Sequence, residues 1–385
     1  MRALHVMDVL PWPPRNGYRS DIWPRLKTLR RLGFRVDLLT TAPKSALTEE
    51  ARSILCDIAE DVRFVKRTSV ARCAMSAKPM AVARSSTLAH VPLRGFYDLV
   101  VTESEHVMPI FSNPSLRAGL RVLRVHNDEC KYMGELARAA EGTLWKAYYF
   151  SEQFKYRWMK SFPMAEAKID QWWHISRQSV GINEFQDETV RWLPPSLEPV
   201  GETAPAPARD SRVVLFVGGL GNPLNREAVR WYANSVHPAL HDCTGYRLIV
   251  AGSAGNSRPA QDLAAWLRRI PRCDVFLDLD SLDPIYREAA IIINPMRRGS
   301  GVKLKTIHAI QQGIPLVTTS TGAEGSGFED PAHLRIADDP ASYAQAIREL
   351  FADPQQGREM TIRAFRFLRE NYDCERNLRS LLCLL

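Results

Sequence analysis

One segment, Asn294–Gly327, constrains the fold of this chain more than any other stretch of its sequence. It reads NPMRRGSGVKLKTIHAIQQGIPLVTTSTGAEGSG, and the apolar run Ala290–Ile293 comes directly before it. The pattern predicts a buried strand, a glycine-rich loop with four cations, a short amphipathic helix, a second strand and another glycine-rich turn. A helix N-terminus presents unpaired N–H groups and the positive end of its dipole. The unit therefore predicts a site for a phosphorylated ligand.

Apolar runs alternate with helical patterns along the rest of the chain, in two series. The first series runs from Ala3–Met7 to Asp170–Ile175, and the second from Arg212–Val217 to Leu316–Thr318. Because strands that alternate with helices are typical of parallel βαβ units, we expect an α/β protein of two Rossmann-like, doubly wound domains that face each other across a cleft. Ligands of such sheets bind beyond the carboxyl ends of the strands, so the cleft is the expected site.

A proline-rich stretch, WLPPSLEPVGETAPAPARD, separates the two series. Its composition is typical of an extended linker, and a chain of 385 residues usually forms two domains. We therefore predict an N-terminal domain over 1–195, a linker over 196–210 and a C-terminal domain over 211–362. The remaining residues, 363–385, have a helical pattern and are predicted to pack back on the N-terminal domain.

The composition indicates a globular protein of the cytoplasm. Hydrophobic residues make up 45% of the chain and charged residues 24%, and the formal net charge of +8 favours anionic partners. The seven cysteines, from Cys56 to Cys383, form no CxxC pair. They indicate reduced thiols and neither a disulfide framework nor a zinc site. Only the net charge favours nucleic acid, so we expect no nucleic-acid partner.

No stretch of the sequence approaches the roughly 20 apolar residues that span a bilayer. Contact with the inner membrane surface is therefore expected to be peripheral. The helix pattern after the first strand carries a tryptophan and several cations: Trp23, Arg25, Lys27, Arg30 and Arg31. These side chains fit an anionic or membrane-bound acceptor, and they fit an ordinary solvated helix face equally well.

In their order and spacing, these motifs resemble those of GT-B glycosyltransferases, above all the bacterial branch related to glycosyltransferase family 4 (glycosyl transferases group 1). The resemblance covers nearly the whole chain. The second half carries it in FVGGLGNPLNREAVRWY, GSGVKLKTIHAIQQGIPLVTT and TGAEGS, and the first half in LPWPPRNGYRSDIWPRL, RVHNDE and WLPPS. It implies a nucleotide-sugar donor held by the C-terminal domain and a glycan or lipid-linked acceptor held mainly by the N-terminal domain. It also implies a retaining reaction without metal or cofactor, in the synthesis of a surface polysaccharide or glycoconjugate.

The resemblance implies a donor site made of glycines, cations and hydrogen-bonding side chains of the second half: Gly218, Gly219, Gly299, Ser300, Gly301, Lys303, Lys305, His308 and Glu324. Gly299 and Gly301 would let the backbone approach the phosphates closely. Lys303 and Lys305, in the first turn of the helix, would supply charge-assisted contacts. The two arginines before them, at 297 and 298, fit the same role or a solvated loop.

Two positions depart from the family pattern. Many members carry two glutamates eight residues apart, one near the donor sugar and one on the ribose, and the matching residues here are Ser300 and His308. A carboxylate accepts two ribose hydroxyls, whereas a neutral imidazole has one acceptor and one donor. His308 therefore indicates a weaker ribose contact, an unusual donor or a degenerate site. Glu324 is the alternative contact to ribose or sugar.

The first half supplies the remaining site predictions. His126 directly follows a predicted strand, and the resemblance puts a histidine here, close to the transferring sugar, so His126 is the predicted catalytic residue. Asn16 and Gly17 match the family loop that approaches the phosphates or the acceptor. Glu103 and Glu105 are candidates for an acceptor-side base. Each has a structural alternative as well: a packing histidine, a simple turn or a solvated carboxylate.

Three other functions are alternatives to a glycosyltransferase. A nucleotide-sugar epimerase needs clustered acids and bases, and the sequence shows scattered ones. A non-catalytic protein that binds a nucleotide or a partner is favoured by Ser300 and His308. A dinucleotide dehydrogenase is disfavoured because no G-x-G-x-x-G follows the first strand of either half.

Overall fold

The computed structural model describes residues 1–385 apart from 15–16, 162–167, 178–188, 199–200, 202–210 and 384–385. Two compact units make up the chain. Unit 1 comprises Met1–Gly134, Ala147–Glu198 and Tyr372–Leu385, and unit 2 comprises Glu135–Lys146 and Pro199–Asn371.

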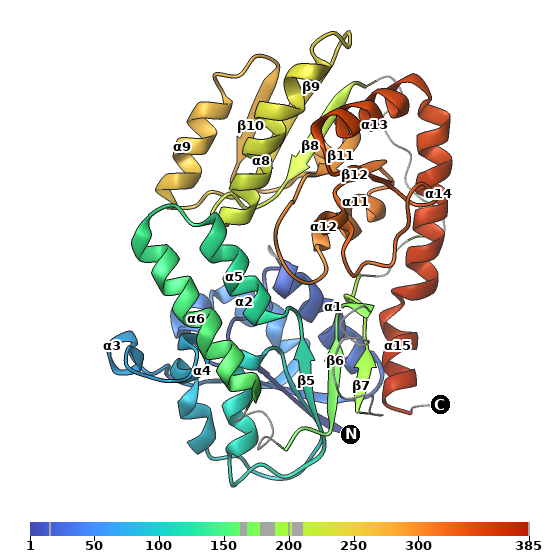
Figure 1. The fold of residues 1–385 in the computed structure, drawn as a ribbon. Helices are drawn as coiled ribbons and strands as arrows, with labels where there is room; N and C mark the ends of the chain where they lie inside the picture. The colour runs from blue at the N-terminus through green and yellow to red at the C-terminus, as the bar shows by residue number, and fades with distance from the viewer. Residues whose placement is uncertain (15–16, 162–167, 178–188, 199–200, 202–210, 384–385) are drawn as a thin grey trace. The chain divides into compact units, whose positions relative to one another are not determined.

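A parallel sheet of seven strands forms the centre of unit 1, in the order β3-β2-β1-β4-β5-β6-β7 (Figure 1). The strands are β1 (Arg2–Met7), β2 (Arg35–Thr40), β3 (Ala59–Phe64), β4 (Tyr97–Thr102), β5 (Ala118–Val125), β6 (Gln171–His174) and β7 (Val190–Trp192). The order reverses between β1 and β4, so the loops that leave these two strands diverge. Such a switch point is where open α/β sheets bind ligands.

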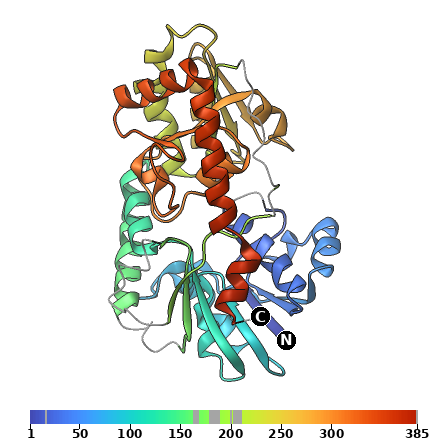
Figure 2. The same cartoon turned by 90° about the vertical axis from the view of Figure 1, so that its right-hand side faces the viewer.

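Helices cover both faces of this sheet (Figures 1 and 2). The helices that lie wholly or partly in unit 1 are α1 (Gly17–Arg31), η1 (Lys44–Ala46), α2 (Glu49–Cys56), α3 (Val70–Cys73), α4 (Met80–Arg84), η2 (Ser86–His90), η3 (Glu105–Ser112), α5 (Glu129–Ala139), α6 (Thr143–Ser161) and α15 (Cys374–Leu381). Successive side chains of a strand point to opposite faces of the sheet. In β1, Ala3 and Met7 lie on one face, and Leu4 and Val6 lie on the other. The first pair packs with α1 and α15, and the second with η2, η3 and α6.

Unit 2 repeats the design with a parallel sheet of six strands, in the order β10-β9-β8-β11-β12-β13. The strands are β8 (Val213–Val217), β9 (Arg247–Gly252), β10 (Cys273–Leu277), β11 (Ala289–Asn294), β12 (Leu316–Thr318) and β13 (Arg335–Ile336). The helices are α8 (Pro223–Ser235), η4 (His237–Leu240), α9 (Arg258–Leu267), α10 (Asp283–Glu288), α11 (Leu304–Gln311), α12 (Ser320–Ala323), α13 (Pro340–Ala352) and α14 (Pro354–Asn371). Here the switch point lies between β8 and β11.

These two sheets confirm the predicted α/β class with two Rossmann-like domains. The chain stays in unit 2 through Asn371, nine residues beyond the predicted end of the C-terminal domain, and α15 packs against α1 of unit 1. Most of the predicted linker, 196–210, lies outside the described residues. Within the part of the chain that is described, no helix is long and apolar enough to cross a membrane.

Candidate functional site

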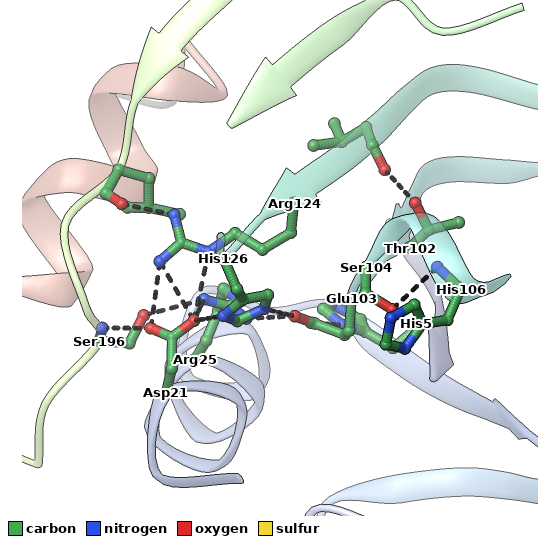
Figure 3. Close-up of polar contacts among 12 residues, drawn as sticks. His5, Asp21, Arg25, Thr102, Glu103, Ser104, His106, Arg124, His126 and Ser196 are labelled. Carbon is green, nitrogen blue, oxygen red and sulfur yellow. Dashed lines mark hydrogen bonds and ion pairs between the residues drawn. The ribbon is translucent and has the colours of Figure 1, made fainter. Parts of the chain in front are cut away.

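The carboxyl edge of the unit 1 sheet gathers charged side chains from distant parts of the sequence (Figure 3). Glu103 is the first residue after β4, and His126 is the first after β5. Asp21 and Arg25 lie one turn apart on α1, the helix that follows β1. These residues therefore meet at the switch point between β1 and β4.

Asp21 is the centre of the network. Its carboxylate accepts hydrogen bonds from Arg25 Nη1 at 2.9 Å, from Arg124 Nε and Nη2 at 3.1–3.2 Å, and from the Ser196 backbone N–H at 2.6 Å. Asp21, Arg25 and Arg124 are fully buried. Burial alone would raise the pKa of Asp21, but the charges of Arg124 and Arg25 outweigh it and lower the pKa to about 2.

His126 lies between two carboxylates. Its Nδ1 is 3.6 Å from Asp21 Oδ2, and its Nε2 is 3.5 Å from Glu103 Oε2. The Tyr18 ring packs on the imidazole with 4.7 Å between ring centroids. Since only 8% of the His126 side chain is exposed, these neighbours fix its orientation.

Glu103 is fully buried and doubly paired. One oxygen pairs with Arg25, and the other lies 2.9 Å from His5 Nδ1. Burial opposes its charge, but Arg25 and the two histidines hold the pKa of Glu103 well below its ordinary value. A carboxylate held ionised in this way is a weak base. The structure places Glu103 where it can support His126, and its role as an acceptor-side base stays a prediction from the sequence.

A second cluster lies at the same strand ends. Asp8 follows β1, His106 lies in η3 after β4, and Glu129 begins α5 after β5. His106 Nδ1 is 3.0 Å from Asp8, and its Nε2 is 3.9 Å from Glu129. Burial would lower the pKa of His106, but these two carboxylates raise it well above its ordinary value. Glu105 is also buried, and burial together with the charge of Glu129 raises its pKa to about 7.

Of these residues, the sequence predicts a chemical role only for Glu105, and its acids and bases look scattered along the chain. The folded chain brings them together. The available signal was position, because Asp8, like Glu103 and His126, directly follows a strand. Arg25 was assigned to a surface of cations and is instead fully buried, and Trp23 is buried as well. Asn16 lies outside the described residues, and Gly17 is the first residue of α1.

Asp21, Glu103 and His126 offer three ligand atoms that lie within 4.8 Å of one another, a spacing that a metal ion could use. Both carboxylates, however, already accept from buried guanidiniums. Two carboxylates and two guanidiniums balance in charge, so a divalent cation here would add two uncompensated positive charges to a buried site.

In unit 2, the loop between β11 and α11 is built around two glycines. Gly299 has a φ of +135° and Gly301 a φ of +71°, conformations that side-chain-bearing residues rarely adopt. Lys303 is the N-cap residue of α11. It therefore lies just before the first helical turn, and not within that turn as the sequence predicted. Its Nζ donates to the Gly301 carbonyl at 2.7 Å and pairs with Glu324 Oε2 at 3.1 Å. The structure thus brings together four of the predicted donor residues: Gly299, Gly301, Lys303 and Glu324.

Lys305 connects this loop to the turn after β8. Its Nζ donates to Asn225 Oδ1 at 2.6 Å and lies 4.8 Å from the centroid of the Phe216 ring. The Asn225 amide in turn donates to the Gly219 carbonyl at 2.8 Å. Burial, and then the charge of Lys303, lower the pKa of Lys305 to about 7. Asn225 was not singled out from the sequence, although it follows the predicted glycine turn.

The remaining predicted residues surround the same strand ends. Gly218 follows β8 and lies so close to Gly252 that a Cβ on Gly252 would be 2.0 Å from the Gly218 carbonyl oxygen. Ser300 is buried in the glycine loop. His308 lies on α11, and burial lowers its pKa, which favours the neutral imidazole. A neutral His308 offers one donor and one acceptor.

Comparisons with known proteins agree with this architecture. The model of the family described as "Glycosyl transferases group 1" matches residues 211–353. A Klebsiella pneumoniae protein described as "Uncharacterized 44.6 kDa protein in cps region" is 31% identical over 391 residues, which cover 99% of this chain and 98% of that protein.

Solved structures share the fold at low sequence identity. TarM of S. aureus has a TM-score of 0.70 at 10% identity, over 100% of this chain and 98% of its own. Sucrose-phosphate synthase of Thermosynechococcus elongatus has a TM-score of 0.69 at 14% identity, over 100% and 98%. HepE of Anabaena, solved with UDP and glucose, has a TM-score of 0.64 at 12% identity, over 99% of both chains.

Proposed function

Because the chain belongs to the glycosyl transferases group 1 family and is a glycosyltransferase of the GT-B fold, we propose that it moves a sugar from a nucleoside diphosphate to a glycan or lipid-linked acceptor, with retention and without a metal. The observation that carries the proposal is the glycine loop at the start of α11, with Lys303 held between Gly301 and Glu324. The relative from a cps region supports a role in polysaccharide synthesis.

The loop has the chemistry that a diphosphate requires. Gly299 and Gly301 have no side chains that would keep a phosphate from the loop backbone before α11, and the dipole of this helix favours negative charge at its N-terminus. Lys303 and Lys305 add cations at the same helix end. Because the pKa of Lys305 is lowered to about 7, a bound diphosphate would raise it again and draw a proton onto the amine. We assign the metal's usual role, neutralising the leaving group, to these cations.

We assign His126 to the transferring sugar. Asp21 and Glu103 lie on either side of its ring and hold it in one orientation. In a retaining reaction of this type, the acceptor hydroxyl enters on the face from which the diphosphate leaves, so no protein nucleophile is needed. His126→Ala should therefore lower kcat by about tenfold or more and change diphosphate affinity little. Unchanged kcat would return His126 to a structural role, and His90→Ala, at an exposed position, is the matched control.

Calorimetric titration with UDP, GDP, ADP and dTDP in the presence of a chelator tests the donor site. UDP is the first ligand to try because HepE and TarM have both been solved with it. We expect one diphosphate to bind without metal and Lys303→Ala to weaken it about tenfold to a hundredfold, as for the loss of a charge-assisted hydrogen bond. Arg258→Ala, an exposed cation in unit 2, should bind normally. Binding that requires a divalent cation would overturn the metal-independent mechanism.

The same preparation separates the alternatives. A transferase consumes the sugar nucleotide only when an acceptor is present, and the anomeric configuration of the product reports retention. The clustered acids and histidines of unit 1 make an epimerase the second candidate. An epimerase would convert the sugar nucleotide into its epimer without an acceptor. Binding without turnover would favour the non-catalytic protein that Ser300 and His308 suggested.

A further inference from the structure

The helix α6 carries a row of exposed aromatic side chains that the protein core does not use. Phe150, Phe154 and Trp158 are spaced by four residues and so lie along one side of the helix. Their exposed fractions are 51%, 68% and 52%. Large apolar side chains gathered on one surface mark a contact with a partner or a membrane. We call this row the α6 aromatic stripe.

Beyond its first turns, α6 is anchored on the side opposite the stripe, so the stripe is not a core face that happens to be open. Tyr156 and Met159 are buried in the core of unit 1. Glu152 is buried as well and accepts a hydrogen bond from the Met80 backbone N–H of α4 at 2.6 Å. The orientation of α6 therefore leaves the stripe facing solvent.

Cations accompany the stripe. Lys146 precedes Phe150 by four residues and Arg157 follows Phe154 by three, which places both beside the aromatic rings. Both cations are exposed. Glu152 is the one acidic residue in the α6 sequence TLWKAYYFSEQFKYRWMKS, and it is buried on the anchored side. The solvent face of α6 is thus both aromatic and positively charged.

We propose that the α6 aromatic stripe docks on the surface of a bilayer that contains anionic lipid. Aromatic rings favour the interface between headgroups and acyl chains, and each nearby cation adds attraction to anionic headgroups. A second copy of the chain fits less well, because pairing two such faces would bring Lys146 and Arg157 of both copies together. The proposal does not depend on the transfer reaction, but it would bring a transferase to a lipid-linked acceptor.

Co-sedimentation with vesicles tests the proposal without any nucleotide. Wild-type protein should bind vesicles of phosphatidylcholine that contain about 30% phosphatidylglycerol. It should bind more weakly to vesicles of phosphatidylcholine alone, and more weakly to the anionic vesicles at high salt. Phe150→Ser with Phe154→Ser should weaken the binding about tenfold to a hundredfold, since two partly buried phenyl groups no longer insert. Phe96→Ser is the matched control, because Phe96 is 54% exposed in unit 1 but lies outside α6.

The charges are tested by Lys146→Glu with Arg157→Glu, which should abolish the preference for anionic vesicles. Each variant should keep the thermal unfolding midpoint of the wild type, which shows that it is folded. Equal vesicle binding by the Phe150→Ser, Phe154→Ser variant and the wild type would overturn the proposal, as would the absence of binding to anionic vesicles. A dimer in sedimentation velocity that the same variant dissociates would assign the stripe to a second copy and also overturn it.

Discussion

Replacement of Asp21 by asparagine tests the buried charge network of unit 1 most directly. The carboxylate accepts from Arg25, Arg124 and the Ser196 backbone, and the two arginines have no exposed surface. Asparagine keeps the volume and one acceptor oxygen but removes the charge. The two guanidiniums of the network then face a single carboxylate, that of Glu103.

The expected loss of stability follows from two arguments. The pKa of Asp21 falls from 3.8 to about 2 on folding, which is worth about 2.5 kcal/mol at roughly 1.4 kcal/mol for each pKa unit. Removal of one partner of a buried ion pair typically costs about 3–5 kcal/mol. Asp21→Asn should therefore destabilise unit 1 by about 2–5 kcal/mol at pH 7. Because the folded pKa is depressed, this stabilisation is complete above about pH 4 and is lost as the pH falls through about 2.

Hydrogen exchange in increasing urea, read by mass spectrometry, measures the two units separately. Peptides from α1 and β5 should open at lower urea in Asp21→Asn, whereas peptides from β8 and α13 serve as the internal reference. Glu198→Gln is the control, because Glu198 pairs with Lys27 at 2.8 Å on an exposed surface and should contribute under about 1 kcal/mol. A loss below about 1 kcal/mol in Asp21→Asn would refute the reasoning.

Three further predictions concern single residues. Glu105→Gln should stabilise unit 1 above pH 7 by about 1–3 kcal/mol and have little effect below pH 4.5. The reason is that folding raises the pKa of this carboxyl from 4.5 to about 7, so its ionisation destabilises the fold as the pH rises from 4.5 to 7. Denaturation at several pH values checks this, and a difference in stability between variant and wild type that does not change with pH would contradict it. Gly252→Ala should weaken UDP binding several-fold by pushing the Gly218 turn away, whereas Gly221→Ala, where a Cβ meets no atom within 4 Å, should bind normally. UDP binding at pH 7.5 should take up a fraction of a proton, measured by calorimetry in buffers of different ionisation enthalpy, and Lys305→Met should abolish the uptake.

The sequence predicted the central strands because they are buried on both faces. The apolar run Ala290–Ile293 corresponds to β11, Ala289–Asn294, within one residue at each end. The edge strands β3 and β7 were not predicted. β3 reads AEDVRF and is largely exposed or half-buried, and β7 has three residues, all half-buried. These two edge strands have fewer neighbours to cover them, and their sequences lack the apolar signal.

The two candidate sites also differ in how far the sequence could predict them. The loop at Gly299–Lys303 is contiguous, so its glycines, cations and helix start could be read together. The network around Asp21 joins residues up to 175 positions apart, and that closeness exists only in the folded sheet. Asp21 and Arg25, four residues apart on a helix, have the same pattern as a surface ion pair. Nothing local distinguishes the two, because burial depends on the strands around them.

The energetics of the network indicate why it is built from charges. An apolar cluster of similar volume is often as stable as a buried ion-pair network, or more so, so stability alone does not require Asp21, Arg25, Glu103 and Arg124. What the charges provide is orientation. Carboxylates on both sides of His126 fix its ring, and the guanidiniums keep those carboxylates ionised. Under the proposed function, positive charge develops on the sugar as the diphosphate leaves, and a preorganised site with ionised carboxylates behind the histidine stabilises that charge without rearranging.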